Sequence, residues 1–376
     1  MRKYDRWPAG LIPVLILVLA PPLLGCSPQR TVEAVGVLRE IAGVPHHAPQ
    51  REHVARTAVT FAIEGRQHEG DIYVGRKPPK ATMIMVPGAA PGGRDDPRLV
   101  ALANTFARAG FEVLVPELER MRELQVTATD ARILADAVLH MAERDPERPL
   151  GMAALSFALG PSVLALLKPG VEAHADFVLA VGGYYDLEQA ITYFTTGYYR
   201  GSPAEPWRYL EPNAFGKWMF VLSNAQRVDD QQDQETLRRM AQRKIQNLAA
   251  DVSDLALRLG PKGQSVYALI TNEDPERVPE LLASLPPDVL AEIRALDLSP
   301  KPVETLDVDF ILIHGRDDPI IPFTQSVAFA EALAPERAHL YLIDGLDHVD
   351  PEALGIVDSF RMVQAVYHLL SIRDGR

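Results

Sequence analysis

The apolar residues of this chain form short runs whose pattern changes along the sequence. Residues 57–63 and 68–74 alternate apolar and polar positions around a Glu-Gly-Arg turn, which predicts an antiparallel β-hairpin at the edge of a sheet. Six later runs are almost continuously apolar, as is typical of strands that are buried on both faces. These runs are residues 81–86, 111–115, 150–155, 175–181, 308–313 and 338–343.

Segments with apolar residues at helical spacing separate most of these predicted strands. They cover residues 97–109, 127–144, 157–167 and 324–333. Alternation of strand and helix predicts the α/β class, with a mostly parallel sheet and helices on both of its faces. Because such sheets bind ligands beyond the carboxyl ends of their strands, we expect functional residues in the loops that follow the strands.

The alternation is interrupted between the sixth and the seventh predicted strands. Eleven aromatic residues lie between Tyr184 and Phe220, of which most would attach this segment to the core and a few would line a pocket. Apolar residues then recur at helical spacing from Leu237 to Leu259, where Gly260-Pro261 ends the predicted helix. Shorter helical patterns cover 278–285 and 287–296. We therefore expect residues 184–302 to form a helical cap, and residues 55–183 and 303–376 to form the core.

The amino end of the chain has a composition of its own. Basic residues at positions 2, 3 and 6 precede an apolar run over 11–20 and the sequence Leu23-Leu-Gly-Cys26. This succession resembles a bacterial lipoprotein signal peptide over residues 1–25. The resemblance implies that Cys26, the single cysteine of the chain, receives a diacylglyceryl group. Ser27 at the next position implies a lipid-anchored protein of the bacterial cell envelope, at the outer membrane and facing the periplasm.

An uncleaved membrane anchor is the alternative interpretation of this segment. However, the apolar run 11–20 is shorter than the roughly 20 residues that a spanning helix needs, and prolines interrupt and flank it. Residues 26–54 are predicted to form an N-terminal linker that contains three prolines. His46 and His47 within it are interpreted as solvated residues rather than metal ligands, because cysteines and spaced carboxylates are missing nearby.

The composition and charge of the chain limit the partners that we expect. The chain has 376 residues, of which 47% are apolar and 23% charged, which is ordinary for a globular protein. Its formal net charge is −12, and removal of residues 1–25, with three bases and one acid, changes this value to −14. Nucleic acid is therefore not expected as a partner. Because there is no polybasic patch, membrane association would depend on the lipid at Cys26.

A serine lies where the predicted strand 150–155 gives way to the next helix. Ser156 is enclosed by small residues, with Ala154 and Ala158 two positions before and after it. A serine in such a strand-turn-helix arrangement is lifted above the sheet edge, and the tight turn requires small neighbours. This pattern predicts a nucleophile, although on the local sequence alone a buried, inert serine remains the alternative.

Three loops at the predicted carboxyl edge supply the groups that acyl-transfer chemistry needs. Residues 86–93 form a loop of small residues whose backbone can approach a ligand closely. Residues 314–322 carry the adjacent acids Asp317 and Asp318, and His348 lies in the loop after the last strand. His314 and His339, at a strand end and inside a strand, are expected to be structural. Asp96, before Pro97, is expected to cap a helix.

These residues occur in the order serine, acid, histidine, and the segment Ile-His-Gly-x-x-Asp-x-x-Ile-Pro at 313–322 is the most specific feature. Over residues 55–375 the chain resembles the α/β-hydrolase family. The resemblance implies Ser156 as nucleophile, His348 as general base and Asp318 as its orienting acid. It also implies an oxyanion hole made by the backbone N–H groups of Ala89 and Phe157.

The chain departs from the pattern of that family at several positions. Alanines take the places of the glycines around Ser156, and Pro87 takes the place of the histidine that many relatives have before Gly88. These departures weaken assignment to any subfamily, but they remove no reacting group. The serine itself argues against the haloalkane dehalogenase branch, whose nucleophile is an aspartate. Asp317 and Asp186 remain the alternatives to Asp318.

The expected function is a membrane-tethered serine hydrolase that cleaves a carboxylic ester or thioester through an acyl-enzyme. We expect a small-molecule substrate with an apolar acyl group, no cofactor and no metal. A peptidase or an acyltransferase would use the same triad, because the leaving group or acceptor is selected by the cap. A catalytically inactive hydrolase fold that serves as a binding protein of the envelope is the alternative from another functional class.

Overall fold

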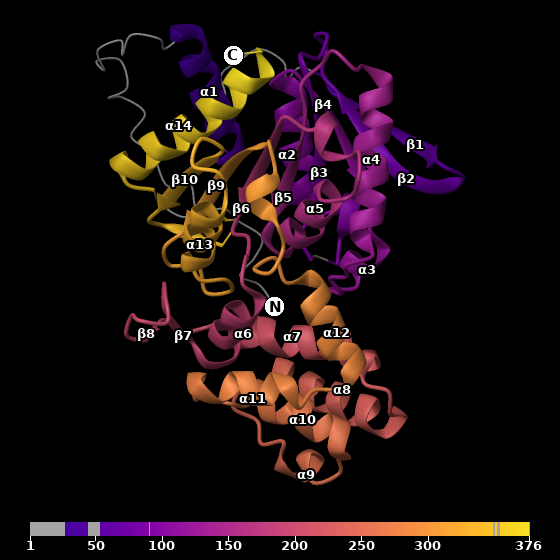
Figure 1. Cartoon of the computed structure of the whole chain (residues 1–376), viewed down its shortest axis with the longest axis vertical. Helices are drawn as coiled ribbons and strands as arrows, with labels where there is room; N and C mark the ends of the chain where they lie inside the picture. Colours follow the sequence, from indigo (N-terminus) through magenta and orange to yellow (C-terminus); the bar gives the residue numbers. More distant parts are fainter. Residues whose placement is uncertain (1–26, 44–52, 90, 349, 352–353, 376) are drawn as a thin grey trace.

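A computed structural model of the chain describes residues 27–43, 53–89, 91–348, 350–351 and 354–375 (Figure 1). The predicted signal peptide, Cys26, His46 and His47 lie outside the described residues. In the part of the chain that is described, no helix has the length and apolar character needed to cross a membrane.

The centre of the protein is an eight-stranded sheet with the order β1-β2-β4-β3-β5-β6-β9-β10. β2 pairs antiparallel with both β1 and β4, whereas all other neighbours are parallel. The predicted mostly parallel α/β sheet is therefore confirmed. Its strands are β1 (Ala55–Ile63), β2 (Arg66–Val74), β3 (Ala81–Val86), β4 (Phe111–Pro116), β5 (Leu150–Leu155), β6 (Phe177–Val181), β9 (Asp309–Gly315) and β10 (Ala338–Ile343).

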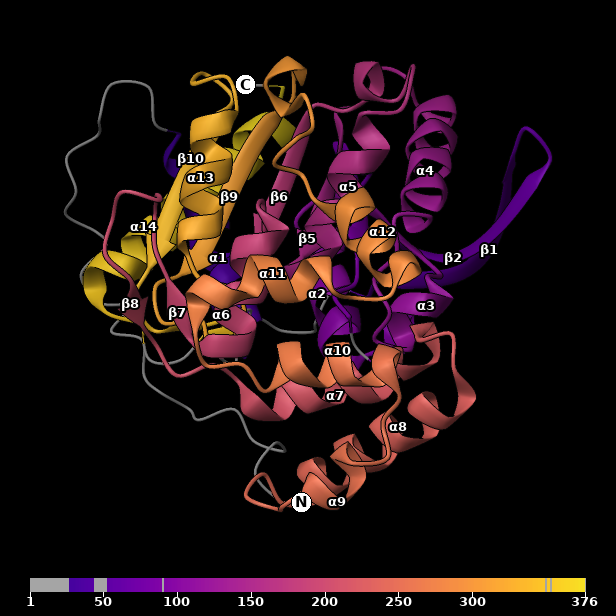
Figure 2. The same ribbon diagram turned by 60° about the horizontal axis from the view of Figure 1, so that its bottom comes forward.

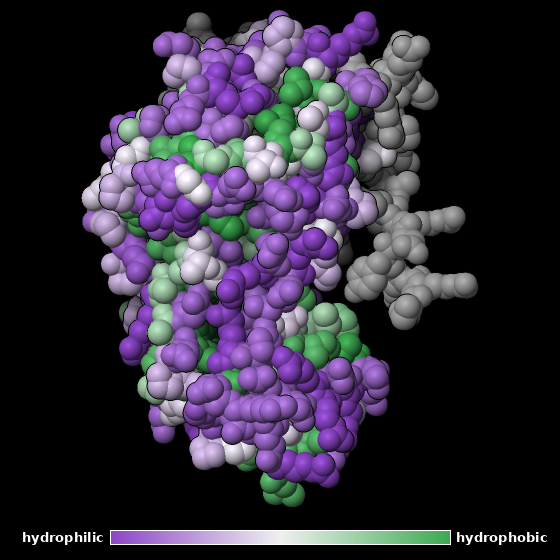
Figure 3. Space-filling model, turned by 90° about the vertical axis from the view of Figure 1, so that its right-hand side faces the viewer, coloured by the Kyte–Doolittle hydropathy of each residue, from purple (hydrophilic) through white to green (hydrophobic). Residues whose placement is uncertain are grey.

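Helices cover both faces of this sheet, because alternate residues of each central strand point to opposite sides. In β3, Ile84 and Val86 contribute to the core shared with α4, α5 and α13. Met83 and Met85 contribute to the core shared with α1, α2 and α14. The outer side of α4 and of the β1–β2 hairpin is mostly hydrophilic (Figure 3). The core helices are α1 (Pro28–Ile41), α2 (Pro97–Arg108), α3 (Glu119–Arg122), α4 (Asp130–Arg144), α5 (Leu159–Leu166), α13 (Thr324–Ala332) and α14 (Ile356–Arg373).

The predicted linker over residues 26–54 is wrong for its first half, where helix α1 packs against α14 and α2. Ser27 is the N-cap of this helix, and Pro28 stands in the first turn, where its missing N–H costs nothing. Ala34 and Val37, one turn apart, are buried in the core. A helix of this kind depends on the partner that covers its apolar face, and the sequence pattern did not identify that partner.

Residues between β6 and β9 form a helical cap beside the end of the sheet at which β5, β6 and β9 finish (Figures 1 and 2). The cap has apolar clusters of its own. α12 leads back to the core, where Leu296 is buried. The elements of the cap are α6 (Leu187–Thr196), β7 (Tyr198–Tyr199), β8 (Arg208–Tyr209), α7 (Ala214–Asn224), α8 (Gln231–Gln246), α9 (Ser253–Ala256), α10 (Pro261–Ile270), α11 (Val278–Ala283) and α12 (Pro287–Leu296).

The single helix predicted to end at Gly260 is divided in the structure. α8 ends at Gln246, and Asn247 adopts an extended backbone conformation. The side chain of Asn247 accepts a hydrogen bond from the N–H of Ala249, at 3.1 Å, which stabilises the turn. Apolar residues on both sides of the break still pack into one cluster, which explains why their spacing resembles that of a continuous helix.

Candidate active site

Ser156 occupies a tight turn between β5 and α5. Its φ angle is +57°, in the left-handed region that side chains rarely adopt, and residues 156–158 form a single 3₁₀ turn. Ala154 and Ala158 are fully buried, as expected for positions that this turn crowds. The Ser156 residue itself is 8% exposed, so its hydroxyl lies in a sheltered position at the carboxyl edge of the sheet.

His348 connects this serine to an acid. Its Nε2 lies 2.7 Å from Oγ of Ser156, and its Nδ1 lies 2.7 Å from Oδ2 of Asp318. The residue follows the short strand β11 (Leu346–Asp347), which pairs with β12 (Asp350–Pro351), and has a φ angle of +56°. The structure therefore brings together the three side chains that the sequence predicts, although 192 positions separate the serine from the histidine.

Asp318 is fully buried, and both of its carboxylate oxygens have partners. Oδ1 accepts hydrogen bonds from the N–H groups of Ile320 and Ile321, at 2.8 and 3.0 Å. Burial raises the pKa of this carboxyl, but the charge of His348 and the hydrogen bonds from His314 and His348 outweigh burial and hold the pKa well below its usual value. The carboxylate therefore stays ionised and fixed toward the imidazole.

The competing acids lie elsewhere. Asp317 is exposed to solvent. Asp186 caps α6, where its side chain accepts from the N–H of Gln189.

His314 is buried, with Nδ1 2.6 Å from Oγ of Ser326 and Nε2 2.9 Å from the carbonyl oxygen of Ile321. The same Nε2 also lies 3.3 Å from Oδ2 of Asp318. The structural role predicted for His314 therefore includes support of the loop that carries Asp318.

Gly182, immediately after β6, makes room for the histidine and the acid. A Cβ atom at this position would lie 3.1 Å from Nδ1 of His348 and 3.4 Å from Oδ2 of Asp318, and its φ angle is +63°. Gly182 was not among the residues predicted for the site. The Gly182-Gly183 pair at the end of a buried strand is the signal that points to a close approach there.

The two positions predicted for the oxyanion hole lie in segments beside Ser156. Phe157 is the next residue and is partly buried, and its ring contacts that of Tyr184 at 5.8 Å between centroids. Ala89 follows Gly88, where a Cβ atom would lie only 3.6 Å from Cβ of Ser156. The loop after β3 therefore begins in the immediate neighbourhood of Ser156.

An apolar cavity of about 160 Å³ lies between the cap and the core. Phe157 forms part of its wall, so the cavity borders the residue after Ser156. Within the aromatic-rich stretch, Tyr184, Phe194 and Phe220 line the cavity, whereas other aromatics contact one another outside it. Most of the remaining lining residues are aliphatic side chains of the cap helices. Such a cavity can hold an apolar group.

Among the described residues, no group of three or more histidine, cysteine or acidic side chains is arranged to hold a metal ion. The predicted Asp96 cap is present, since this side chain accepts from the N–H of Arg98 at 2.9 Å.

Comparison with known proteins identifies the fold. No sequence-family model matches the chain, and no curated protein matches it. A candidate hydrolase from Legionella pneumophila subsp. pneumophila str. Philadelphia 1 is similar in structure, with a TM-score of 0.52 and 11% sequence identity over 91% of this chain and 95% of that chain. The chain thus has an α/β-hydrolase-like fold. Because the identity is low, this likeness concerns the fold alone.

Two peptidases are less similar in structure. A puromycin-hydrolyzing peptidase from Mycobacterium tuberculosis matches with a TM-score of 0.49 and 14% identity, over 88% of this chain and 40% of that chain. The acylaminoacyl peptidase of Pyrococcus horikoshii matches with a TM-score of 0.47 and 10% identity, over 86% of this chain and 41% of that chain. The present chain therefore spans less than half the length of these two proteins.

Proposed function

We propose that this protein is a serine hydrolase that cleaves carboxylic esters or thioesters through an acyl-enzyme. The observation that carries the proposal is the continuous chain of hydrogen bonds from Ser156 through His348 to Asp318. A serine, a histidine and a buried acid in this order and at these distances form the arrangement that activates a hydroxyl for attack on a carbonyl carbon. A binding protein would not require it.

In the proposed reaction, Oγ of Ser156 attacks the carbonyl carbon while Nε2 of His348 accepts the hydroxyl proton. The negative charge on the carbonyl oxygen is stabilised by the N–H groups of Ala89 and Phe157. His348 then gives the proton to the departing alcohol or thiol. Water, activated by the same histidine, releases the acid and restores the serine. Asp318 holds the imidazole in the required tautomer and stabilises its positive charge.

The acyl group of the substrate is proposed to be apolar, because the cavity beside Phe157 is lined mainly by aliphatic and aromatic side chains. Burial of each methylene group in such a cavity is worth about 0.8 kcal/mol. Cleavage of amides and transfer of the acyl group to an alcohol use the same groups.

A fluorophosphonate probe tests the proposal, since it modifies only a serine that a neighbouring base has activated. The wild-type protein is expected to be labelled, and Ser156→Ala is expected to lose the label. Ser284→Ala, at an exposed serine of the cap, is the control and should be labelled like the wild type. Absence of labelling in folded wild-type protein would instead support the inactive binding protein.

We also propose that Cys26 carries the lipid that tethers the protein to the envelope. Support comes from the signal-like sequence before Cys26 and from its being the single cysteine of the chain. Replacement of Cys26 by alanine is expected to move the protein out of the membrane fraction or to block its processing. A variant that stays in the membrane with unchanged mobility would favour an uncleaved anchor.

A further inference from the structure

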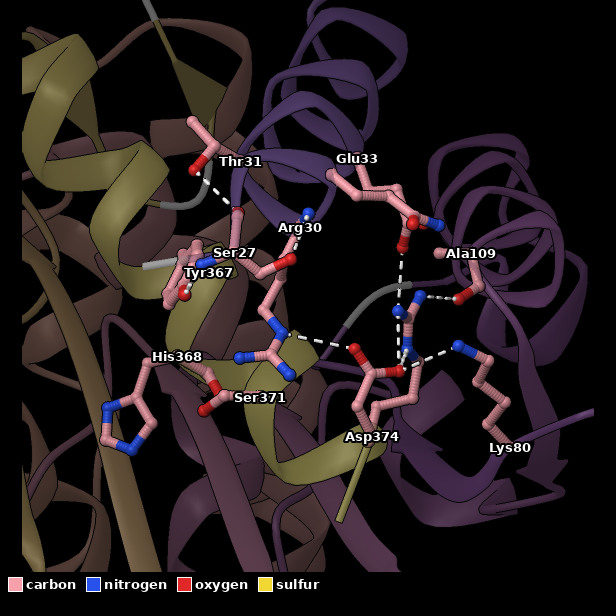
Figure 4. Close-up of polar contacts among 12 residues, drawn as sticks. Ser27, Arg30, Thr31, Glu33, Lys80, Ala109, Tyr367, His368, Ser371 and Asp374 are labelled. Carbon is pink, nitrogen blue, oxygen red and sulfur yellow. Dashed lines mark hydrogen bonds and ion pairs between the residues drawn. The ribbon is translucent and has the colours of Figure 1, made fainter. Parts of the chain in front are cut away.

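The chain is fastened to the folded body immediately after Cys26. The backbone N–H of Ser27 donates a hydrogen bond to the hydroxyl of Tyr367 on α14, at 2.8 Å (Figure 4). The side chain of Ser27 caps α1 by accepting from the N–H of Arg30. One residue therefore separates the proposed lipid site from a packed helix. The first half of the predicted N-terminal linker is thus the helix Pro28–Ile41.

Ion pairs hold α1 in this position. Arg30 lies 3.1 Å from Asp374, which also pairs with Lys80 at 3.0 Å (Figure 4). Arg373 is buried, pairs with Glu33 at 2.7 Å and donates to the carbonyl oxygen of Ala109. These contacts connect α1 to the end of α14, to the start of β3 and to the end of α2. A buried, fully partnered arginine fixes the geometry of the elements that it joins.

The outer side of α14 carries apolar residues on the same stripe as Tyr367. Ile356 and Phe360 precede Tyr367 by eleven and seven positions, which correspond to nearly whole turns of a helix. Ile356, Val357 and Phe360 are 62%, 61% and 43% exposed. The distance along the helix from Ile356 to Tyr367 is about 16 Å at 1.5 Å per residue. This exposed end of α14 also follows closely on the loop that contains His348.

We propose that Ile356, Val357 and Phe360 lie in the interface of the lipid bilayer to which the N-terminal segment is attached. The inference rests on the proposed membrane attachment. Cys26 comes directly before Ser27, and six residues separate the apolar run 11–20 from Ser27. A bilayer that holds the lipid on Cys26 therefore lies next to Tyr367, and a bilayer spanned by an uncleaved anchor lies within those six residues of Ser27. The rigid α1 then keeps the body close to the bilayer, with the apolar stripe of α14 facing it.

A site-specific fluorescent probe tests this orientation. Phe360→Cys and, as control, Leu257→Cys each add one thiol at an exposed apolar residue. Leu257 is 88% exposed and follows α9, which Figure 1 shows at the opposite end of the molecule from α1. Each full-length protein is reconstituted in vesicles of phosphatidylethanolamine and phosphatidylglycerol, labelled, and compared with and without nitroxide-bearing lipids.

The proposal predicts that the probe at position 360 loses most of its fluorescence in nitroxide-containing vesicles, whereas the probe at 257 keeps it. Equal quenching at both positions, or none at 360, in protein that floats with the vesicles would overturn the docking but leave the attachment intact. Protein that does not float with the vesicles would overturn both. The parent chain shows whether Cys26 itself takes the label. Labelling of Cys26 would mean that its thiol carries no lipid and that the uncleaved N-terminal segment is the anchor. The same comparison is then made in Cys26→Ser chains, which keep that anchor.

Discussion

At the scale of single residues, the two adjacent acids of the segment Arg316-Asp-Asp-Pro319 have opposite environments. Asp318 is fully buried and hydrogen-bonded to His348, whereas Asp317 is exposed. An amide at position 318 would present the wrong hydrogen-bonding group to the imidazole. We expect Asp318→Asn to lower kcat by about 10⁴, the scale of this loss in serine proteases. Asp317→Asn should change kcat little.

Initial rates with an activated ester, together with circular dichroism to verify folding, distinguish the two variants. A large loss of kcat in Asp317→Asn, together with a nearly normal kcat in Asp318→Asn, would show that Asp318 is not the acid that orients His348. If both variants were active, Asp186 would be the next acid to replace.

Alanine substitutions at two glycines with similar backbone conformations distinguish the effect of backbone strain from an effect on catalysis. Gly182 and Gly170 both have positive φ angles, +63° and +79°. An added Cβ atom meets His348 and Asp318 at Gly182, but nothing within 4 Å at Gly170. Both alanine variants should lose about 1 kcal/mol of unfolding free energy from the unfavourable φ. Only Gly182→Ala should also lose most of its kcat.

Urea unfolding and steady-state kinetics on the same preparations measure the two effects. Retention of full kcat by Gly182→Ala would mean that the histidine and the acid shift together without loss of alignment. An equal loss of kcat in Gly170→Ala would indicate a general effect of stability.

At the scale of elements, β10 and α14 meet through two histidines. The rings of His339 and His368 lie 4.0 Å apart between centroids, and Nε2 of His339 is buried without a hydrogen-bond partner among the described residues. Burial, and then the proximity of His339, lower the pKa of His368 from 6.5 to about 4. Burial also lowers the pKa of His339. Both rings are therefore neutral in the folded protein at neutral pH.

This interface predicts a loss of stability in mild acid. Between pH about 6.5 and about 4 the unfolded chain binds protons that folded His368 does not, so the unfolding free energy falls as the pH decreases through this range. Allowing for its partial exposure, we expect His368 to contribute about 1–2 kcal/mol to that fall. His368→Phe should reduce the pH dependence by this amount. His174→Phe, at an exposed histidine, is the control and should leave the pH dependence unchanged. Equal pH profiles of the unfolding free energy for the wild type and His368→Phe would contradict the prediction.

At the scale of the whole molecule, the cavity exists only because the cap is folded onto the core. Its lining comes from α6, α7, α10 and α12 as well as from Phe157 of the core. With esters from acetate to octanoate, we expect kcat/KM to rise about fourfold per methylene, since each is worth about 0.8 kcal/mol, until the cavity is filled.

A pair of substitutions tests whether this cavity holds the acyl group. Ala190→Leu enlarges a residue of the lining and should shift the optimum to shorter chains. Ala283→Leu, on the exposed side of α11, should leave the optimum unchanged. A flat profile across the ester series, or the same optimum in Ala190→Leu, would place the acyl group elsewhere.

Features that depend on local spacing could be predicted from the amino-acid sequence alone. The eight strands of the sheet could be predicted because each is a short apolar or alternating run, and hydrophobic period is a local property. The turn at Ser156 and the segment around Asp318 could be located because their small and charged residues stand at fixed offsets. The resemblance to the α/β-hydrolase family also favoured Asp318 over Asp317.

Features that depend on which residues lie side by side in space become defined only when the chain is folded. α1 was missed because its short apolar face is stable only against α14 and α2. The break at Asn247 was missed because residues before and after it pack into one cluster. Gly182 has a recognisable neighbour only once His348 and Asp318 have been brought together. The cavity likewise arises from side chains of separate helices, and no pattern along the chain specifies which of them meet.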